Sequence, residues 1–340
     1  MAAGRWSWRR FLLLAVSVVF VAATFFYFLP KIADYRDVWG VLDDLTWPWV
    51  LALLGATVLN VLTFAPPWMV VLPGLRFRSA LVLTQVSTAL SIVAPAGAAV
   101  GIAGSYGILR TWGFPPRQIG RAVTLVSLWN QFANLSLPII AVFLLTATGG
   151  DSALLATAAF IGVGVLGVAV AALALVLASD STATVIGDET ARLVNWVRGK
   201  FRRVPVLWGG ESFERFRRDT VELLRRRWYL LTLTSYAGTL TVFLVLLLSL
   251  RACGVPGSEV SLVEAFAAWS LARLLGSIPI TPGGIGVVEL SLTGALLGFG
   301  GSNAGVVAAV LLYRFLTIMP TVALGLVAST VVRRRWVAAM

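Results

Sequence analysis

Four ionisable residues lie within the long apolar stretches of this chain: Glu264, Arg273, Glu289 and Arg314. A charge at the centre of a membrane helix costs about 2.5 to 3.5 kcal/mol on insertion scales, so such residues usually face a protein interior or a water-filled cavity and find a partner. Arg273 precedes the turn sequence TPGG and Glu289 follows it. A chain that folds back at this turn brings both to a similar depth, and an ion pair of Glu289 with Arg273 or Arg314 is expected.

Two roles are open for these charges. In the first, the ion pair locks a helical hairpin to the last apolar span. In the second, an arginine binds the phosphate of a lipid headgroup, because a guanidinium group matches phosphate in bidentate geometry. Glu289 would then compete with the phosphate for that arginine, and Glu289 and Glu264 are the carboxylate candidates for coupling to a proton or ion gradient. The two roles are compatible.

The turn beside Glu289 interrupts the apolar stretch with prolines and glycines, and an earlier stretch, APAGAAVG, offers a similar turn without a charge. Glycines permit tight turns and leave backbone amides that lipid cannot satisfy. Such a turn either binds an anion at the start of the next half-helix or allows close helix packing. The residues expected to shape the two hairpins are Pro95, Gly97, Pro282, Gly283, Gly284 and Gly286.

A cluster of polar side chains follows the first of these turns. Ser127, Asn130, Gln131 and Asn134 are spaced so that they share roughly one face of a helix. Hydrogen bonding between helices is the commoner use of such residues, and the other is to line a polar pathway. Asn130 is the residue of this cluster that we include among the candidates for substrate contact.

Composition places these residues in a membrane protein of several spans, since 59% of the residues are hydrophobic and 12% are charged. The chain has no histidine and one cysteine, Cys253, which excludes a histidine base, an internal disulfide and histidine or cysteine metal sites. No phosphate-binding nucleotide loop is present. We therefore expect neither a metal nor a cofactor.

The apolar runs predict an all-α fold with about six full transmembrane helices and two broken helical hairpins. The hairpins, at 81–109 and 262–298, each either re-enter on one face or cross twice. The whole chain, 1–340, reads as one membrane domain that contains repeat units at 81–145 and 262–330. The full spans are expected at 11–29, 48–72, 121–145, 152–178, 229–250 and 305–330.

The charges of the loops predict the orientation of these spans. Basic residues fall in one alternating set of loops and most acidic residues in the other, so the positive-inside rule places both termini in the cytoplasm. The segment 187–228 is then a basic, amphipathic cytoplasmic segment, which either lies on anionic headgroups or forms a solvated loop. Because orientation accounts for the net charge of +12, nucleic acid is not an expected partner.

The two broken stretches resemble each other in sequence. With this topology they open from opposite sides of the membrane, so the units form an inverted repeat, a plan that recurs in alternating-access carriers. A chance pair of kinks is the alternative. The matching positions are Pro95, Gly97 and Val100 with Pro282, Gly284 and Val287.

Two sequences near the C-terminal end, ARLLGSIPITPGGIGVVEL and LLYRFLTIMPTVALG, resemble the signature of the lysylphosphatidylglycerol synthase transmembrane, or flippase-like, family. The resemblance covers about residues 10–335, and Tyr313 and Arg314 match the YR pair of its final span. APAGAAVGIAGSYGILRTWGF resembles the first-repeat motif of stand-alone members and lacks the Arg and Glu of the P-G-R-x-G-E pattern. That departure puts headgroup contact by the first half in doubt.

The resemblance implies two pseudo-symmetric halves that move a phospholipid or a polyprenyl-type glycolipid between leaflets. Relatives that make lysyl-lipid carry a further aminoacyl-transferase domain, and since this chain ends at Met340, no enzymatic activity is expected. The expected setting is a bacterial plasma membrane, with anionic or isoprenoid-linked lipids as partners. The alternative is a non-transporting scaffold, with envelope-biosynthesis enzymes or a second copy of the chain as partner. The candidates for substrate contact are Arg273, Glu289, Arg314, Tyr313, Glu264 and Asn130.

Overall fold

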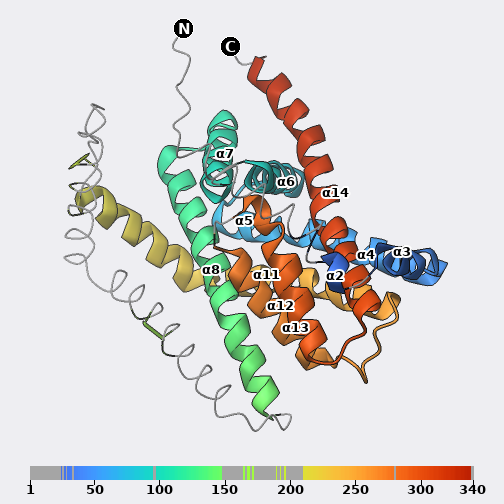
Figure 1. The fold of residues 1–340 in the computed structure, drawn as a ribbon. Helices are drawn as coiled ribbons and strands as arrows, with labels where there is room; N and C mark the ends of the chain where they lie inside the picture. Colours follow the sequence, from blue (N-terminus) through green and yellow to red (C-terminus); the bar gives the residue numbers. More distant parts are fainter. Residues whose placement is uncertain are drawn as a thin grey trace.

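The computed structural model describes residues 29–32, 34–94, 97–147, 210–278 and 281–337, together with a few single residues outside these ranges. Within them every regular element is helical (Figure 1). In chain order the elements are α2 (Leu29–Ile32), α3 (Tyr35–Asp43), α4 (Trp47–Thr63), α5 (Pro66–Val71), α6 (Phe77–Val93), α7 (Gly97–Thr111), α8 (Pro116–Ala147), α11 (Gly210–Ala252), α12 (Leu262–Gly276), η2 (Pro282–Gly284), α13 (Val287–Gly298) and α14 (Asn303–Val337).

Four helical stretches in the described part of the chain are long and apolar enough to cross a membrane. They coincide with the predicted spans 48–72, 121–145, 229–250 and 305–330, whereas the predicted spans 11–29 and 152–178 lie outside the described residues. Helices satisfy their own backbone hydrogen bonds, as hydrocarbon requires. The protein is therefore an all-helical membrane protein in its described part. The four stretches are Trp47–Val71, Pro116–Ala147, Arg217–Ala252 and Asn303–Thr330.

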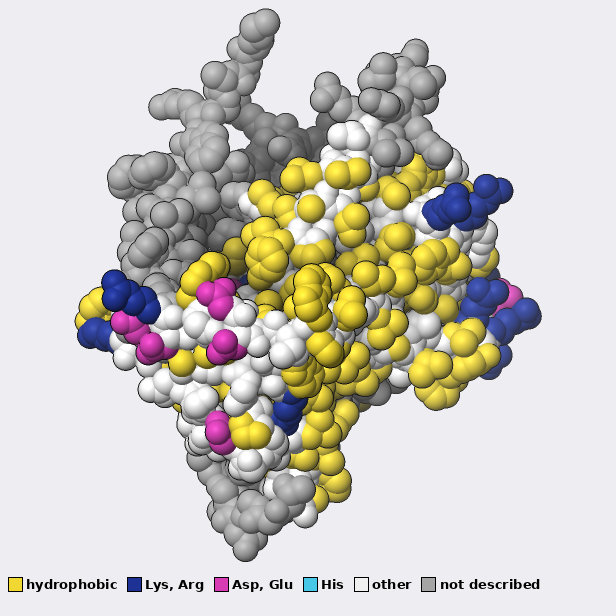
Figure 2. All heavy atoms as spheres, turned by 90° about the vertical axis from the view of Figure 1, so that its right-hand side faces the viewer, with side chains coloured by type: hydrophobic (Ala, Val, Ile, Leu, Met, Phe, Trp, Pro, Cys, Tyr) yellow, Lys and Arg dark blue, Asp and Glu magenta, His cyan; other side chains and the backbone are white. Residues whose placement is uncertain are grey.

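The surface of the described residues fits this assignment. Figure 2 shows hydrophobic side chains over a broad, continuous area of one face, with Lys and Arg gathered toward its edges. Large apolar residues such as Leu51, Phe143 and Val327 are each more than half exposed. A soluble protein rarely exposes so wide an apolar area, whereas lipid chains cover it at no cost.

The first broken stretch forms a hairpin in which α6 and α7 pack against each other. Their approach depends on glycine. A Cβ atom at Gly97 would lie 1.8 Å from the carbonyl oxygen of Ser91, and one at Gly101 would lie 1.9 Å from the hydroxyl of the same serine. Pro95, which was also expected to shape this turn, lies outside the described residues.

The second broken stretch forms a hairpin of α12 and α13 joined through η2. Three glycines of the turn have positive φ angles, 63° at Gly283, 66° at Gly284 and 87° at Gly286. Residues with a Cβ atom rarely adopt this conformation, so glycine lets the chain reverse within a few residues. Pro282 begins η2.

The turns of the two hairpins meet. A Cβ atom at Gly283 would lie 3.2 Å from the side chain of Ile92 and 3.5 Å from its carbonyl oxygen, so η2 packs against the last turn of α6. Helix α14 contacts both hairpins, because it packs along α6 and along α13. At Gly325 the approach of α14 to α6 is close enough that a Cβ atom would lie 2.7 Å from the carbonyl oxygen of Gln85.

Each hairpin belongs to its own hydrophobic core. One core surrounds α6 and α7 with residues from α5 and α8, and the other surrounds α12 and α13 with residues from α14. Helix α11 contributes to both, with Leu231 in the first core and Leu246 in the second. In Figure 1 the N-terminal part of α11 extends outward from the bundle. Helix α11, like α8, which also contributes to both cores, therefore links the two halves of the described structure.

Cys253 follows the span that ends at Ala252 and is 3% exposed. Burial raises the pKa of its thiol to about 12. Because the thiolate is the reactive form, we expect the folded protein to resist a maleimide reagent at pH 7 to 9 and the protein unfolded in detergent to react fully. A gel shift with a polymer-linked maleimide measures this. Complete modification of the folded protein within minutes would contradict the buried position.

Candidate functional site

The second hairpin turn is fastened to α14 by a buried ion pair. Arg314 donates from Nε to Oε1 of Glu289 at 2.7 Å and from Nη2 to the carbonyl oxygen of Gly283 at 3.0 Å. The other carboxylate oxygen of Glu289 accepts from the backbone N–H of Gly286 at 2.7 Å. The side chain of Glu289 is 2% exposed and that of Arg314 is 13% exposed. We call these four residues the turn clasp.

The local sequence explains where Glu289 lies. It occupies the third position of α13, where a glutamate side chain reaches back to the N–H of the capping residue, Gly286. The first turn of a helix also favours negative charge. Of the two arginines expected to pair with Glu289, the structure selects Arg314, which extends from α14 to both the carboxylate and the turn backbone.

Arg273 has a different partner. Its Nε donates to Oδ1 of Asn134 on α8 at 2.7 Å, and its guanidinium group lies 5.7 Å from the centre of the Trp269 ring. Asn134 in turn donates to Oε1 of Gln131 at 3.2 Å. Arg273 therefore connects the second hairpin to α8 through an amide and makes no ion pair with a described residue.

Tyr313 and Glu264 lie apart from the turn clasp. Tyr313 is 4% exposed in the core of the second hairpin, where its hydroxyl accepts from Nε1 of Trp269 at 3.3 Å. Glu264 is half-buried in the first turn of α12, and its carboxylate accepts from the N–H of Ser261 at 2.8 Å. The turn follows the opposite end of α12, so Glu264 caps its own helix and lies outside the clasp.

A cavity of about 490 Å³ lies beside the first hairpin. Helices α6 and α7 contribute to its wall together with α4, α5, α8 and α11, and the second hairpin contributes Ser277. More than half of the lining residues carry a hydroxyl or a side-chain amide, and none of the described ones is charged. We call it the hydroxyl cavity. Asn130 lines it, whereas the other five candidates for substrate contact do not.

The inverted repeat expected from the sequence predicts a cavity between the two broken hairpins, and the hydroxyl cavity reaches the second hairpin only at Ser277. The carboxylate of Glu289 and the carbonyl oxygen of Gly283 are used in the turn clasp, and the space around α12 and α13 is filled by core residues such as Trp269 and Leu292. The residues of α6 that line the cavity were not predicted from the sequence. Thr84, Ser87, Thr88 and Ser91 recur at helical spacing, which is the signal that marks a polar stripe on one helix face.

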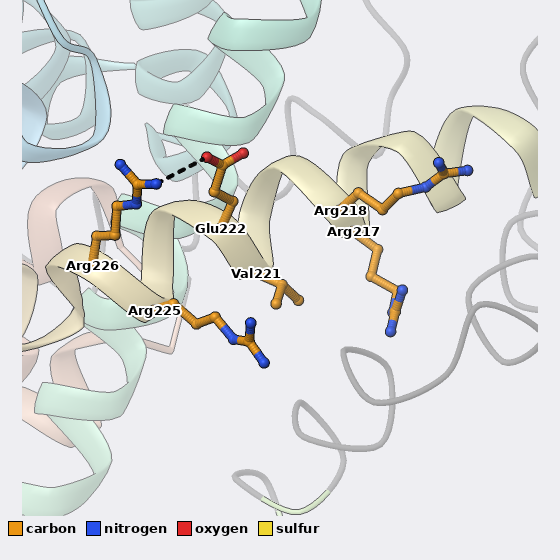
Figure 3. A pocket seen from close by; sticks show the side chains of 6 residues that line it. All are labelled: Arg217, Arg218, Val221, Glu222, Arg225 and Arg226. Carbon is orange, nitrogen blue, oxygen red and sulfur yellow. Dashed lines mark ion pairs between the residues drawn. The ribbon is translucent and has the colours of Figure 1, made fainter.

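A second, basic pocket of about 310 Å³ lies on the N-terminal part of α11. Figure 3 shows the side chains that line it along this one helix, where Arg226 forms an ion pair with Glu222 at 3.8 Å. Arg218 pairs in the same way with Glu214. Of the predicted amphipathic segment 187–228, residues 210–228 belong to α11, and most of the preceding part lies outside the described residues. The lining residues are Arg217, Arg218, Val221, Glu222, Arg225 and Arg226.

The comparison with known protein families agrees with the family resemblance seen in the motifs of the second hairpin. The family model for the lysylphosphatidylglycerol synthase TM region matches residues 12–325, a range that contains both the turn clasp and the hydroxyl cavity. No curated protein sequence matches the chain. The family model covers most of the chain and confirms the resemblance seen in the sequence. The protein belongs to the family of the lysylphosphatidylglycerol synthase transmembrane region.

Proposed function

We propose that the protein is flippase-like and moves a phospholipid or a polyprenyl-type glycolipid between the leaflets of a bacterial plasma membrane, with both of its termini in the cytoplasm. The hydroxyl cavity is the observation that carries the proposal. A lipid headgroup crosses hydrocarbon slowly because its polar groups lose their hydrogen bonds with water. A cavity lined with hydroxyls and amides among apolar helices replaces those bonds, while the acyl chains stay in the bilayer.

The arrangement of the hairpins supports this proposal. Both broken stretches fold as two helices joined by a turn, and the turns meet. We interpret them as the two units of an inverted repeat, which in carriers exposes a central site to one side of the membrane at a time. Transport is then either passive or driven by an ion or proton gradient, and Glu289 is the buried carboxylate that a proton would reach.

The test reconstitutes the purified protein in liposomes that contain lipids with a fluorescent acyl chain, and adds a membrane-impermeant quencher. We expect the signal to fall well beyond the half that the outer leaflet contributes. Asn130→Leu replaces an amide of the cavity lining with an aliphatic side chain of similar shape. We expect this variant to slow the loss of fluorescence by about tenfold. A signal that stops at half, with and without an imposed proton gradient, would contradict the proposal.

Gln118→Leu is the matched control. Gln118 is exposed on the same helix and does not line the hydroxyl cavity. Gln118→Leu makes a similar change from an amide to an aliphatic side chain. We therefore expect this variant to transport lipid as fast as the unmodified protein. Equal loss of transport in both variants would show that Asn130 acts through folding.

A non-transporting scaffold is the second candidate function, and the basic pocket on α11 favours it. Arginine side chains along a helix that extends from the bundle suit contact with an acidic partner or with anionic headgroups. The two functions differ in their dependence on the hydroxyl cavity. A scaffold is insensitive to Asn130→Leu at normal protein level, whereas a carrier is not.

A further inference from the structure

We infer that the hydroxyl cavity selects an uncharged, hydroxyl-rich headgroup, such as a glycosyl or polyol group, over an anionic one. The inference rests on the proposed function and names its substrate class. It differs from the expectation that an arginine handles a lipid phosphate. Three properties of the cavity carry it: its charge, its balance of hydrogen-bond donors and acceptors, and its unpaired amide.

The cavity offers no counter-ion to an anion, because its described lining residues are all uncharged. Neither of the two arginines that were expected to contact a lipid phosphate, Arg273 and Arg314, lines the cavity. Arg314 donates to Glu289 and to the turn backbone, and Arg273 donates to Asn134. An anion that leaves water without an opposite charge loses far more solvation free energy than a neutral polar group does. The charge balance therefore favours a neutral ligand.

The hydroxyl groups of the lining are mainly free to accept. Six of them donate their proton to a carbonyl oxygen three or four residues earlier in their own helix, which leaves the hydroxyl oxygen as an acceptor. A phosphate or carboxylate brings acceptors alone and finds no donor in these six hydroxyls. A sugar hydroxyl brings a donor with each oxygen. The six residues are Thr63, Thr84, Ser87, Ser105, Thr234 and Ser277.

Asn130 supplies the directional part of the site. Its side-chain amide is half-buried, lines the cavity and has no hydrogen-bond partner among the described residues. It therefore presents two donors and one acceptor, which match the paired hydroxyls of a sugar ring. The neighbouring Gln131 is oriented by the amide of Asn134. Phe64 and Trp68 add apolar surface. The lining therefore offers hydrogen-bonding groups together with apolar surface on which the C–H face of a sugar ring can pack.

The size of the cavity agrees with such a headgroup. Sites for small ligands occupy about 300 to 1,000 Å³, and the hydroxyl cavity, at about 490 Å³, falls in the lower half of this range. A headgroup of one or two sugar rings fits this volume, with its acyl or polyprenyl chains left outside among lipid. The cavity is thus large enough for the headgroup and has no need to accommodate the chains.

The test compares three lipids with the same fluorescent acyl chain in the liposome assay: galactosyl diacylglycerol, phosphatidylglycerol and phosphatidylcholine. We expect the galactosyl lipid to cross at least about tenfold faster than phosphatidylglycerol. Asn130→Leu should remove this preference, and Gln118→Leu should retain it. Phosphatidylglycerol that crosses as fast as the galactosyl lipid would overturn the inference while leaving the proposed transport intact.

Binding in detergent separates failure of the inference from failure of transport. The galactosyl lipid is expected to raise the thermal unfolding temperature of the protein, and Asn130→Leu to reduce that rise. Methyl β-galactoside, added in excess, shows whether the sugar alone binds or whether the lipid is required. Binding of the galactosyl lipid without any translocation would preserve the site and reject the transport function. A stronger shift with phosphatidylglycerol than with the galactosyl lipid would overturn the inference.

Discussion

Replacing Glu289 with alanine is expected to lower the free energy of unfolding by about 3 to 5 kcal/mol, the usual cost of removing one partner of a buried ion pair. Arg314 would then remain charged and largely buried without its carboxylate, and the N–H of Gly286 would lose its acceptor. Thermal unfolding in detergent, followed by the loss of monodisperse protein on size exclusion, measures this cost.

The companion variants separate the charge from the shape of Glu289. Glu289→Gln keeps an oxygen that can accept from Gly286 or from Arg314, so we expect a smaller loss of stability. Replacing both Glu289 and Arg314 with methionine removes both charges, and we expect this pair to be more stable than Glu289→Ala. A cost below about 0.5 kcal/mol for Glu289→Ala would show that the turn clasp does not stabilise the hairpin.

Glu289→Gln also separates carrier from scaffold. In a carrier that is coupled to an ion or proton gradient through Glu289, loss of this ionisable group should abolish transport at normal protein abundance. In a scaffold, the variant should matter only as far as it lowers the protein level. Equal loss of function and of folded protein would remove any special role for the carboxylate beyond the turn clasp.

Replacing Gly97 with alanine is expected to lower the free energy of unfolding by about 1 to 3 kcal/mol, or more if the backbone cannot shift. The new methyl group would lie 1.8 Å from the carbonyl oxygen of Ser91, so α6 and α7 would have to separate. Because both helices line the hydroxyl cavity, we also expect weaker binding of its ligand. The thermal unfolding temperature of the folded fraction in detergent measures the loss of stability.

Gly107→Ala on the same helix is the matched control. A Cβ atom there meets nothing within 4 Å, and alanine is favoured over glycine inside a helix by about 0.5 to 1 kcal/mol. We therefore expect Gly107→Ala to leave stability unchanged or to raise it. If the two variants lost stability equally, close packing at Gly97 would not be the reason for the glycine.

The long apolar runs made the spans predictable, because about 20 apolar residues suffice for a crossing whatever the neighbouring helices do. The partner of Glu289 was not predictable in the same way. Arg273 precedes the turn on the same hairpin and Arg314 follows Gly283 by 31 residues, and the choice between them depends on how α14 crosses the second hairpin. Asn134, the partner of Arg273, lies on a helix more than a hundred residues away in the chain.

The hydroxyl cavity was predicted only in part. Asn130 was noticed because an amide is conspicuous among apolar residues, whereas Ser87, Ser91 and Ser105 were not, because a serine inside a helix often bonds to its own backbone. The cavity arises only when α11 packs beside α5 and α8, and that arrangement depends on contacts between distant segments. Sequence therefore identified three residues of the lining, Ser127, Asn130 and Gln131, and could not locate the space.

The contact between Gly283 and Ile92 has a mechanical consequence. Helices are stiff because every turn is held by hydrogen bonds, so a helical membrane protein bends where those bonds are interrupted. Here the second turn lies against the last turn of α6, directly before the first interruption, so the two interruptions are coupled by contact. We expect displacement of either hairpin to push directly on the other, so that the two halves of the protein change shape together.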